Sequence, residues 1–524
     1  LRDADGWAGI EGSPANRRAL IAKAQAYSEK LPLRFRLLVQ YYQAYENGLL
    51  GRAREIAGQM IARDSSDVEA WYQLGEAHYH HDASVFPHAD SLGDLGKALF
   101  AFQHTLGLDS GYTVAYRHIL DVLGNCAADA PWICLRDSTV YAEPEQLVGR
   151  FGRDAIARMR RQALDDRLTA AYGWVAAVPS STSARTQLVR LLMSEQRYAE
   201  AEGQIDGLQA AGQELAAEAL RGHLDYLRGD YVSAGAKMRS VLDRRPTALR
   251  ELLAGGVVDP EDLLLPLMGA GLRDRAMAMS EELFALVPGD SIQGPGNRVY
   301  PKPLMLQALQ LSSLASVGGH PGTARVALAF MDSLTAHYPP DTAEFDPRLA
   351  QSGAALLAAY LVDRDTTLLT RYLRLVDTTR SRTWRPMAAH LILERGDTAA
   401  ALNRYDQNFV QRDSTELVGE FGCARLFAWA DLQARVGNAK ASVDAYALFD
   451  TEASRIKCPA LHVRSWAERG ALYQQLGDSA KAIENYDRFI RAWANADAIL
   501  QPQVDRARKA VAALRGETAP VEGR

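Results

Sequence analysis

The sequence lacks long apolar runs and has no strong excess of charge of either sign. A membrane-spanning helix needs about 18 or more consecutive apolar residues, and no stretch of the 524 residues reaches that length. The net charge is −5, from 59 Lys and Arg against 64 Asp and Glu, so the basic surface of a nucleic-acid-binding protein is not expected. Apolar residues make up 48% of the chain, which is too many for a disordered protein. We therefore expect a folded chain with no nucleic-acid partner and no membrane insertion by this segment.

Motifs of the common enzyme classes are also missing. The sequence has no G-x-G-x-x-G after a strand pattern, no Walker loop, no H-E-x-x-H and no G-x-S-x-G. It also lacks the Gly-rich loop, HRD and DFG motifs of a protein kinase. We expect a protein that is not an enzyme and needs no cofactor.

The chain has only four cysteines, which fall into two local pairs. Cys126 and Cys134 are close in sequence, and Cys423 and Cys458 lie about one repeat apart. Neither pair has the C-x-x-C spacing of a zinc or redox site. Two disulfides would place the chain in an oxidising compartment, whereas four buried thiols would say nothing about location. The sequence leaves the compartment open, and these pairs alone favour the periplasm or cell surface over the cytoplasm.

A repeat is clearest between Val463 and Asn495. Its marker residues fall on two predicted helices that are separated by the turn Leu476-Gly477-Asp478: Trp466, Gly470 and Tyr473 on the first, and Ala482, Tyr486 and Phe489 on the second. This is the W…L-G…Y…A…F pattern of the tetratricopeptide repeat (TPR), which is about 34 residues long. Small residues are needed where the helices cross, and a glycine such as Gly477 ends a helix at low conformational cost.

The same frame recurs along the chain. Pairs of a glycine and a following alanine mark it: Gly48 and Ala53, Gly75 and Ala98, Gly229 and Ala234, Gly271 and Ala276, Gly319 and Ala324, Gly396 and Ala401. Apolar residues recur with helical spacing, and no period-two alternation indicates strands. We predict an all-α fold, a TPR-like solenoid of helix-turn-helix repeats in a right-handed superhelix. It has about ten or eleven units and a capping helix at Gln501–Leu514.

Breaks in this frame suggest how the chain is divided. The expected segments are N-terminal TPR units at 1–110 with an insertion at 82–93, an irregular helical segment at 111–180, middle units at 181–290, a linker at 291–303, C-terminal units and the cap at 304–516, and a frayed tail at 517–524. Within 111–180 we expect helices at Tyr112–Leu123, Glu145–Asp165 and Leu168–Ala177, with a loop at Cys126–Pro144. Residues Asp346–Thr379 fit one further helix pair.

Two stretches resemble a particular bacterial group. One runs from Leu31-Pro32-Leu33-Arg34 to Asp67 and on through Ala70–His81, and the other from Gly470 to Trp493 and the capping helix. Both resemble the TPR-rich C-terminal regions of bacterial serine/threonine protein kinases and related transcriptional activators. The resemblance implies a sensory or scaffolding region, in some members outside the membrane with the kinase inside. The chain begins at Leu1 without a Met or a signal-peptide core, so we expect it to be part of a longer protein, with any kinase upstream.

The first helix of each TPR unit lines the inner face of the superhelix and supplies the candidate binding residues. They are aromatic side chains with a few polar neighbours: Phe35, Tyr42, Tyr45, Tyr72, Glu76, Tyr79 and His80, with His223 and Tyr226 further along. Rigid rings give a peptide groove contact area at low entropic cost. The alternative is that these rings pack inside the superhelix. The Lys and Asn pair of carboxylate-gripping TPRs is absent, because Tyr72 and Glu76 stand at the matching positions.

Histidines near the insertion are candidate metal ligands. His78 and His81 share a helix face, and His88 could fold over them. Imidazole is a common zinc or copper ligand, but a polar helix end beside a solvated loop explains the same residues. We therefore favour a non-catalytic scaffold or sensor that binds a protein or peptide. The alternative is a self-assembling structural subunit of a larger complex or surface layer, and a metal-dependent enzyme ranks last.

Overall fold

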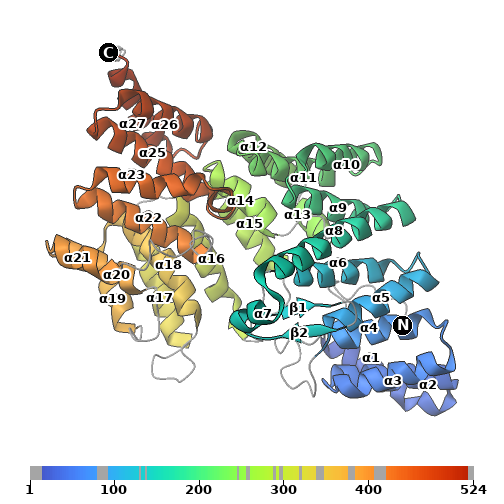
Figure 1. Ribbon diagram of the computed structural model, residues 1–524. Helices are drawn as coiled ribbons and strands as arrows, with labels where there is room; N and C mark the ends of the chain where they lie inside the picture. The colour runs from blue at the N-terminus through green and yellow to red at the C-terminus, as the bar shows by residue number, and fades with distance from the viewer. Residues whose placement is uncertain are drawn as a thin grey trace. The chain divides into compact units, whose positions relative to one another are not determined.

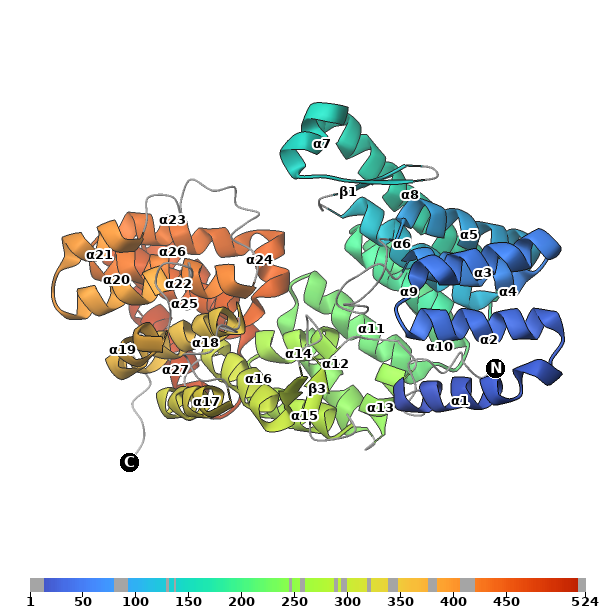
Figure 2. The same ribbon diagram turned by 90° about the horizontal axis from the view of Figure 1, so that it is seen from below.

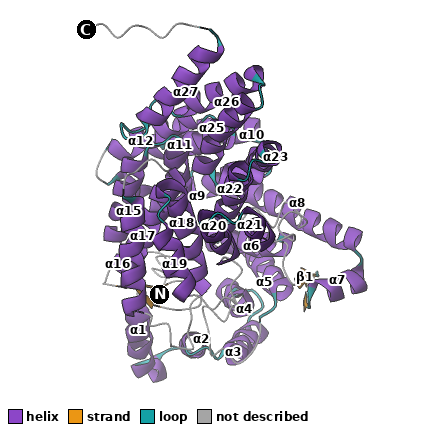
Figure 3. Cartoon of the chain, turned by 90° about the vertical axis from the view of Figure 1, so that its left-hand side faces the viewer, coloured by secondary structure: helices purple, strands orange, loops and turns teal. Residues whose placement is uncertain are grey.

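The computed structural model describes residues 14–79, 93–128, 132–135, 138–244, 247–254, 260–286, 291–293, 299–317, 322–337, 347–375, 384–405 and 420–516. These residues are almost entirely helical, and their strands form two small sheets, each of two three-residue strands (Figure 3). The predicted near-absence of strands is confirmed for this part of the chain. The chain divides into two compact units, unit 1 up to Gln213 and unit 2 from Glu214, apart from short connecting segments.

Unit 1 consists of successive antiparallel helices (Figure 1). Its elements are α1 (Pro14–Ala26), η2 (Ser28–Lys30), α2 (Leu33–Glu46), α3 (Leu50–Arg63), α4 (Val68–Tyr79), α5 (Leu95–Leu108), α6 (Thr113–Ala127), β1 (Trp132–Cys134), β2 (Thr139–Tyr141), α7 (Pro144–Phe151), α8 (Arg153–Ala177), α9 (Thr182–Ser194) and α10 (Tyr198–Ala210). The pairs α2–α3, α4–α5 and α9–α10 are the predicted helix-turn-helix units.

Small residues let the helices of a pair approach closely, as the sequence predicts. A Cβ atom at Gly75 on α4 would lie 2.5 Å from the ring of Phe102 on α5. A larger residue at Gly75 would therefore push α5 away. The buried face of α5 also contributes Leu95, Ala98 and Ala101 to the core, which matches the helical spacing of apolar residues in its sequence.

The segment 111–180 differs from the prediction at two places. The two expected helices Glu145–Asp165 and Leu168–Ala177 are wrong, because α7 ends at Phe151 and α8 then runs unbroken to Ala177. Gly152, with φ of +79°, adopts the backbone conformation that separates the two helices. The expected loop at Cys126–Pro144 contains the β1–β2 hairpin, in which Ile133 pairs with Val140. Figure 2 shows α7 and this hairpin at one end of α8.

Unit 2 contains the remaining helices. They are α11 (Glu214–Leu227), α12 (Tyr231–Asp243), α13 (Ala248–Ala254), α14 (Pro260–Gly269), α15 (Arg273–Leu286), α16 (Lys302–Val317), α17 (Thr323–His337), α18 (Pro347–Asp363), α19 (Thr366–Leu375), α20 (Trp384–Glu394), α21 (Thr398–Tyr405), α22 (Glu420–Arg435), α23 (Ala439–Ala447), η5 (Leu448–Asp450), α24 (Glu452–Lys457), α25 (Pro459–Gln475), α26 (Ser479–Ala492) and α27 (Gln501–Leu514). Strands β3 (Ser291–Gln293) and β4 (Val299–Pro301) lie in the expected linker.

The C-terminal repeat has the predicted construction. A Cβ atom at Gly470 on α25 would lie 2.7 Å from the ring of Tyr486 on α26. Gly477 in the turn has φ of +78°, and Asp478 caps α26 by accepting a hydrogen bond from the backbone N–H of Lys481. The cap is α27, and α18 with α19 forms the expected pair within Asp346–Thr379.

The first helix of this repeat is surrounded by other helices of unit 2. Every residue of α25 from Pro459 to Ser465 is buried, because α14, α16, α22, α23, α24 and α26 all contact this helix. Arg464 in this buried stretch donates from Nη1 to the carbonyl oxygens of Ala315 and Ser316, both at 3.2 Å, at the C-terminal end of α16. A guanidinium there satisfies carbonyls that have no partner within their own helix.

The described residues therefore form an all-α fold of TPR-like helix-turn-helix repeats. In unit 2 the repeats pack against their sequence neighbours and also against repeats that are distant in sequence. Helices α11, α12 and α14 also contact α24, α26 and α25, respectively, so that segments about 200 residues apart or more share one core.

Candidate functional site

The candidate site in unit 1 is the surface formed by the first helices of three consecutive pairs. We call it the first-helix face and define it by these residues of α2, α4 and α6, with Tyr112 just before α6: Phe35, Tyr42, Glu69, Tyr72, Glu76, Tyr79, Tyr112 and His118. Hydrogen bonds between the three helices hold the face together, so its side chains are positioned before any partner arrives.

Glu69 lies at the centre of one hydrogen-bond group. One carboxylate oxygen accepts from the amide of Gln73 at 2.7 Å and from the hydroxyl of Tyr42 at 3.4 Å. The other oxygen accepts from the hydroxyl of Tyr112 at 2.8 Å. The amide of Gln73 also donates to the Tyr42 hydroxyl at 3.0 Å. Tyr42, Glu69 and Tyr112 are all partly exposed, so this anionic group is accessible to solvent.

Glu76 and His118 form a second group on the same face. Nε2 of His118 lies 2.8 Å from a carboxylate oxygen of Glu76, and both side chains are largely buried. Burial alone would lower the pKa of His118, but the charge of Glu76 and its hydrogen bond outweigh burial, so the pKa is raised. Glu76 is thus buried beside a histidine that can offset its charge, and Glu69 is the partly exposed carboxylate of the face.

The tyrosines predicted for this face differ in exposure. Tyr45 and Tyr72 are buried, with 4% and 9% of their surface exposed, and burial raises the pKa of Tyr72. The Tyr72 ring packs against those of Phe102 and Tyr112, with centroids 5.6 Å and 5.1 Å apart. The rings of Tyr45 and Tyr72 therefore pack within the helical array, which is the alternative to a binding role that the sequence left open.

Tyr79 and Phe35 remain available at the two ends of the face. Tyr79 is partly exposed and lies edge-on to His118, with centroids 5.5 Å apart. Burial raises the pKa of Tyr79 to about 12, so the phenol is neutral at physiological pH. Phe35 is 41% exposed, and the guanidinium of Arg34 lies 5.4 Å from its ring centroid. A binding role for the predicted residues of this face stays a prediction.

The histidine cluster is described only at His78. Burial lowers the pKa of His78 to about 4, so its ring is neutral. His80, His81 and His88 lie outside the described residues, as does the insertion. Among the residues that the structure describes, no three side chains of the types that bind metals are grouped for an ion.

The predicted pair in unit 2 lies under another helix. Tyr226 on α11 is 1% exposed, and its hydroxyl donates to the carbonyl oxygens of Ile456 and Arg455 on α24. His223 is largely buried, with Nδ1 3.7 Å from a carboxylate oxygen of Asp262. A ligand could reach Tyr226 only if α24 moved, so the packing does not favour a binding role at this place.

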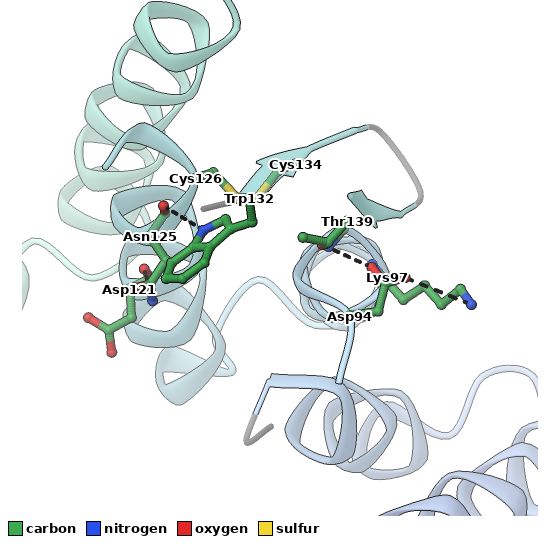
Figure 4. Close-up of a disulfide and its surroundings, with 9 residues drawn as sticks. Asp94, Lys97, Asp121, Asn125, Cys126, Trp132, Cys134 and Thr139 are labelled. Atoms are coloured by element: carbon green, nitrogen blue, oxygen red, sulfur yellow. Dashed lines mark hydrogen bonds and ion pairs between the residues drawn. A yellow bond between two sulfur atoms is a disulfide. The ribbon is translucent and has the colours of Figure 1, made fainter. Parts of the chain in front are cut away.

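Both cysteine pairs named from the sequence are joined as disulfides. The Cα atoms of Cys126 and Cys134 are 5.4 Å apart, and those of Cys423 and Cys458 are 6.2 Å apart, within the usual range for a disulfide. The first bond ties the end of α6 to strand β1 (Figure 4), where the indole N–H of Trp132 also donates to the carbonyl oxygen of Asn125 at 3.1 Å. The second ties α22 to the residue that precedes α25.

Sequence reasoning missed the polar residues that organise the first-helix face. Glu69, Gln73, Tyr112 and His118 were not among the predicted residues, although they hold Tyr42 and Glu76 in place. A signal was available, because Glu69, Gln73 and Glu76 lie three and four residues apart on one helix and so share a face. The contribution of Tyr112 and His118 has no local signal, since it depends on how the third pair packs.

Comparisons with known proteins identify no family. No family model matches the chain, and no curated protein matches it. The solved structures that resemble the chain at low identity include the following three. The structure of Naa15/Naa10 bound to HypK-THB is 14% identical, with 98% of this chain and 78% of that chain covered and a TM-score of 0.23. The P58(IPK) TPR domain is 11% identical, with 92% of this chain and 98% of that chain covered and a TM-score of 0.20. The APC/C hetero-tetramer Cut9–Hcn1 is 10% identical, with 95% of this chain and 96% of that chain covered and a TM-score of 0.24. Likenesses this distant support no inference about function. Within the described residues, no helix is long and apolar enough to cross a membrane.

Proposed function

We propose that the chain is a non-catalytic interaction scaffold and that the first-helix face of unit 1 binds a segment of a protein partner. The observation that carries the proposal is the partly exposed group of Tyr42, Glu69 and Tyr112, held rigid by hydrogen bonds between neighbouring repeats. A preformed surface loses little conformational entropy when it binds. In unit 2, by contrast, Tyr226 on the corresponding helix is covered by α24.

The chemistry of the face favours a partner segment that carries a lysine or arginine. Glu69 is the carboxylate nearest the surface, and tyrosine rings surround it. A cation gains from a carboxylate and from the faces of aromatic rings together. Arg34 on α2 is already engaged by a two-point ion pair with Asp67, at 2.6 Å and 2.8 Å, so it competes little for Glu69.

The test is quantitative capture from a native cell extract by the immobilised chain and three variants. Glu69→Gln removes the charge, and Phe35→Ala removes an exposed ring that shares the face. The matched control is Leu476→Ala, because Leu476 is 49% exposed but lies in unit 2 and so is not part of this face. We expect both face variants to lose a partner that the control retains. Equal capture by all four proteins would show that this face does not bind it.

A second function, self-assembly, has one observation in its favour. On the second-helix side, Phe100 and Leu108 are 53% and 40% exposed. The ring of His104 beside them lies 4.1 Å from that of Trp71 on α4, tilted by 46°. Exposed apolar groups that gather in one place often mark an interface. Light scattering across protein concentration tests this, and Phe100→Ala should weaken any association that it detects.

We also propose that the chain works outside the cytoplasm, as a sensory region of the kind that its resemblance to kinase-associated TPR regions implies. Two disulfides among four cysteines support this location. Thiol counting on denatured, unreduced protein, followed by mass mapping, tests it. Four free thiols in the natively produced protein would contradict the proposal.

A further inference from the structure

Unit 2 contains a pocket of about 560 Å³ that belongs to neither of the predicted binding faces. It lies between α12, the turn that joins α14 to α15, and the C-terminal end of α26. Ala270, Leu272 and Ala492 are buried and form its apolar part, while Arg239, Ser240 and Asn495 are exposed at its rim. The volume is within the range of small-molecule sites.

The pocket exists because small residues let three segments meet closely without filling the space beside them. A Cβ atom at Gly235 on α12 would lie 2.4 Å from Cβ of Ala270 in the turn. A Cβ atom at Gly271 would lie 2.7 Å from Cβ of Ala496, which follows α26. The backbones are therefore fixed against each other, and the alanines next to them leave the pocket open.

One cation at the rim of the pocket, Arg239, makes no direct hydrogen bond or ion pair among the described residues. Asp243 is engaged by Arg275, with Nε and Oδ1 2.8 Å apart. Asp497 nearby accepts the backbone N–H of Asp274 at 2.7 Å, which caps the start of α15. In the described part of the chain, no hydrogen bond or ion pair within 4 Å involves the Arg239 guanidinium, although burial raises the pKa of Asp497 and the charge of Arg239 acts on that carboxyl against the effect of burial. The group free to bind a ligand is thus a guanidinium, flanked by the hydroxyl of Ser240 and the amide of Asn495.

We propose that this pocket binds a carboxylate attached to a short aliphatic chain, with Arg239 as its charged partner. A guanidinium matches the planar carboxylate with two hydrogen bonds, and the buried alanines and Leu272 accommodate methyl or methylene groups. Both a small organic acid and the C-terminus of a peptide that ends in small residues carry this chemistry. The inference is independent of the proposed function, because no residue of unit 1 contributes to the pocket.

Isothermal titration calorimetry of the full chain with three probes tests the proposal. The probes are N-acetyl-alanyl-alanine, its C-terminal amide and propionate. We expect the dipeptide acid to bind at least about tenfold more tightly than its amide, because the amide removes the charge that Arg239 recognises. Propionate binding as tightly as the dipeptide acid would identify a small-acid site, and weaker propionate binding a site for a chain terminus. Equal binding of acid and amide, or no binding of either acid, would overturn the proposal.

Two variants and a control locate the binding. Arg239→Gln should weaken binding of the dipeptide acid about tenfold. Ala236→Leu should block the pocket because the larger side chain occupies its volume, without changing its charge. Arg250→Gln, on an exposed arginine of α13 that does not line the pocket, should leave binding unchanged. Circular dichroism confirms that each variant is folded. If Arg250→Gln weakened binding as much as Arg239→Gln, or if Ala236→Leu had no effect, the pocket would not be the site.

Discussion

The hydroxyl of Tyr231 on α12 lies 2.8 Å from Nδ1 of His462 on α25, across 231 residues of sequence. Nε2 of His462 faces Asp450 at 3.2 Å, and Arg469 donates to the same carboxylate at 2.6 Å and 3.0 Å. Burial opposes ionisation of Asp450, but hydrogen bonds from His462 and Arg469 outweigh it and hold the pKa below its usual value. The ionised carboxylate accepts Nε2–H, which leaves Nδ1 to accept the tyrosine O–H.

Tyr231→Phe should destabilise the protein by about 1–2 kcal/mol, because it leaves the buried Nδ1 of His462 without its partner. Chemical denaturation followed by circular dichroism measures the change. The matched control is Tyr473→Phe, since the hydroxyl of this partly exposed tyrosine has no hydrogen-bond partner among the described residues. An equal loss in both variants would mean that the Tyr231–His462 bond contributes nothing of its own.

His390 should make stability fall as the pH drops from about 6.5 to about 4. Burial lowers its pKa to about 4, so between these values the unfolded chain binds a proton that the folded chain refuses, and stability rises with pH. Protonation of His390 in the unfolded chain alone should lower the free energy of unfolding by about 3 kcal/mol across this pH range. His390→Gln should flatten the dependence of the unfolding free energy on pH. Equal slopes in the variant and the unsubstituted protein would contradict this assignment.

Gly96→Ala should disturb the disulfide-linked hairpin. A Cβ atom there would lie 2.4 Å from the backbone nitrogen of Ser138 and 2.7 Å from its oxygen, and backbone moves less easily than a side chain. We expect a loss of about 2 kcal/mol, measured by urea denaturation. Gly107→Ala on the same helix meets nothing within 4 Å and should stabilise by up to about 1 kcal/mol. The prediction fails if both substitutions change stability in the same direction.

The second disulfide should stabilise more than the first. In the chain-entropy description, a bond that spans 35 residues restricts the unfolded chain more than one that spans 8, which gives about 4 against about 3 kcal/mol. Replacing both cysteines of each pair by alanine, one pair at a time, measures the two effects by chemical denaturation. A larger loss from the Cys126–Cys134 pair would show that contacts in the folded state, and not loop length, decide the difference.

The sequence by itself determined the helical repeats. Helical spacing of apolar residues, small residues such as Gly470 at crossings and turn residues such as Gly477 are local features, and they are visible without any knowledge of the fold. For the same reason the cysteine pairs could be named, since each pair lies within one or two neighbouring elements.

Only the tertiary structure decided which faces of these helices remain accessible. The sequence pattern of α11 presents Tyr226 as it presents the tyrosines of α2 and α4, yet α24 covers Tyr226, while Tyr42 stays partly exposed. The contacts of α11 with α24 and of α12 with α26, and the bond from Tyr231 to His462, likewise join segments more than 200 residues apart. Such contacts depend on the accumulated angles between many helix pairs, and small differences at each pair add up to positions that no local pattern encodes.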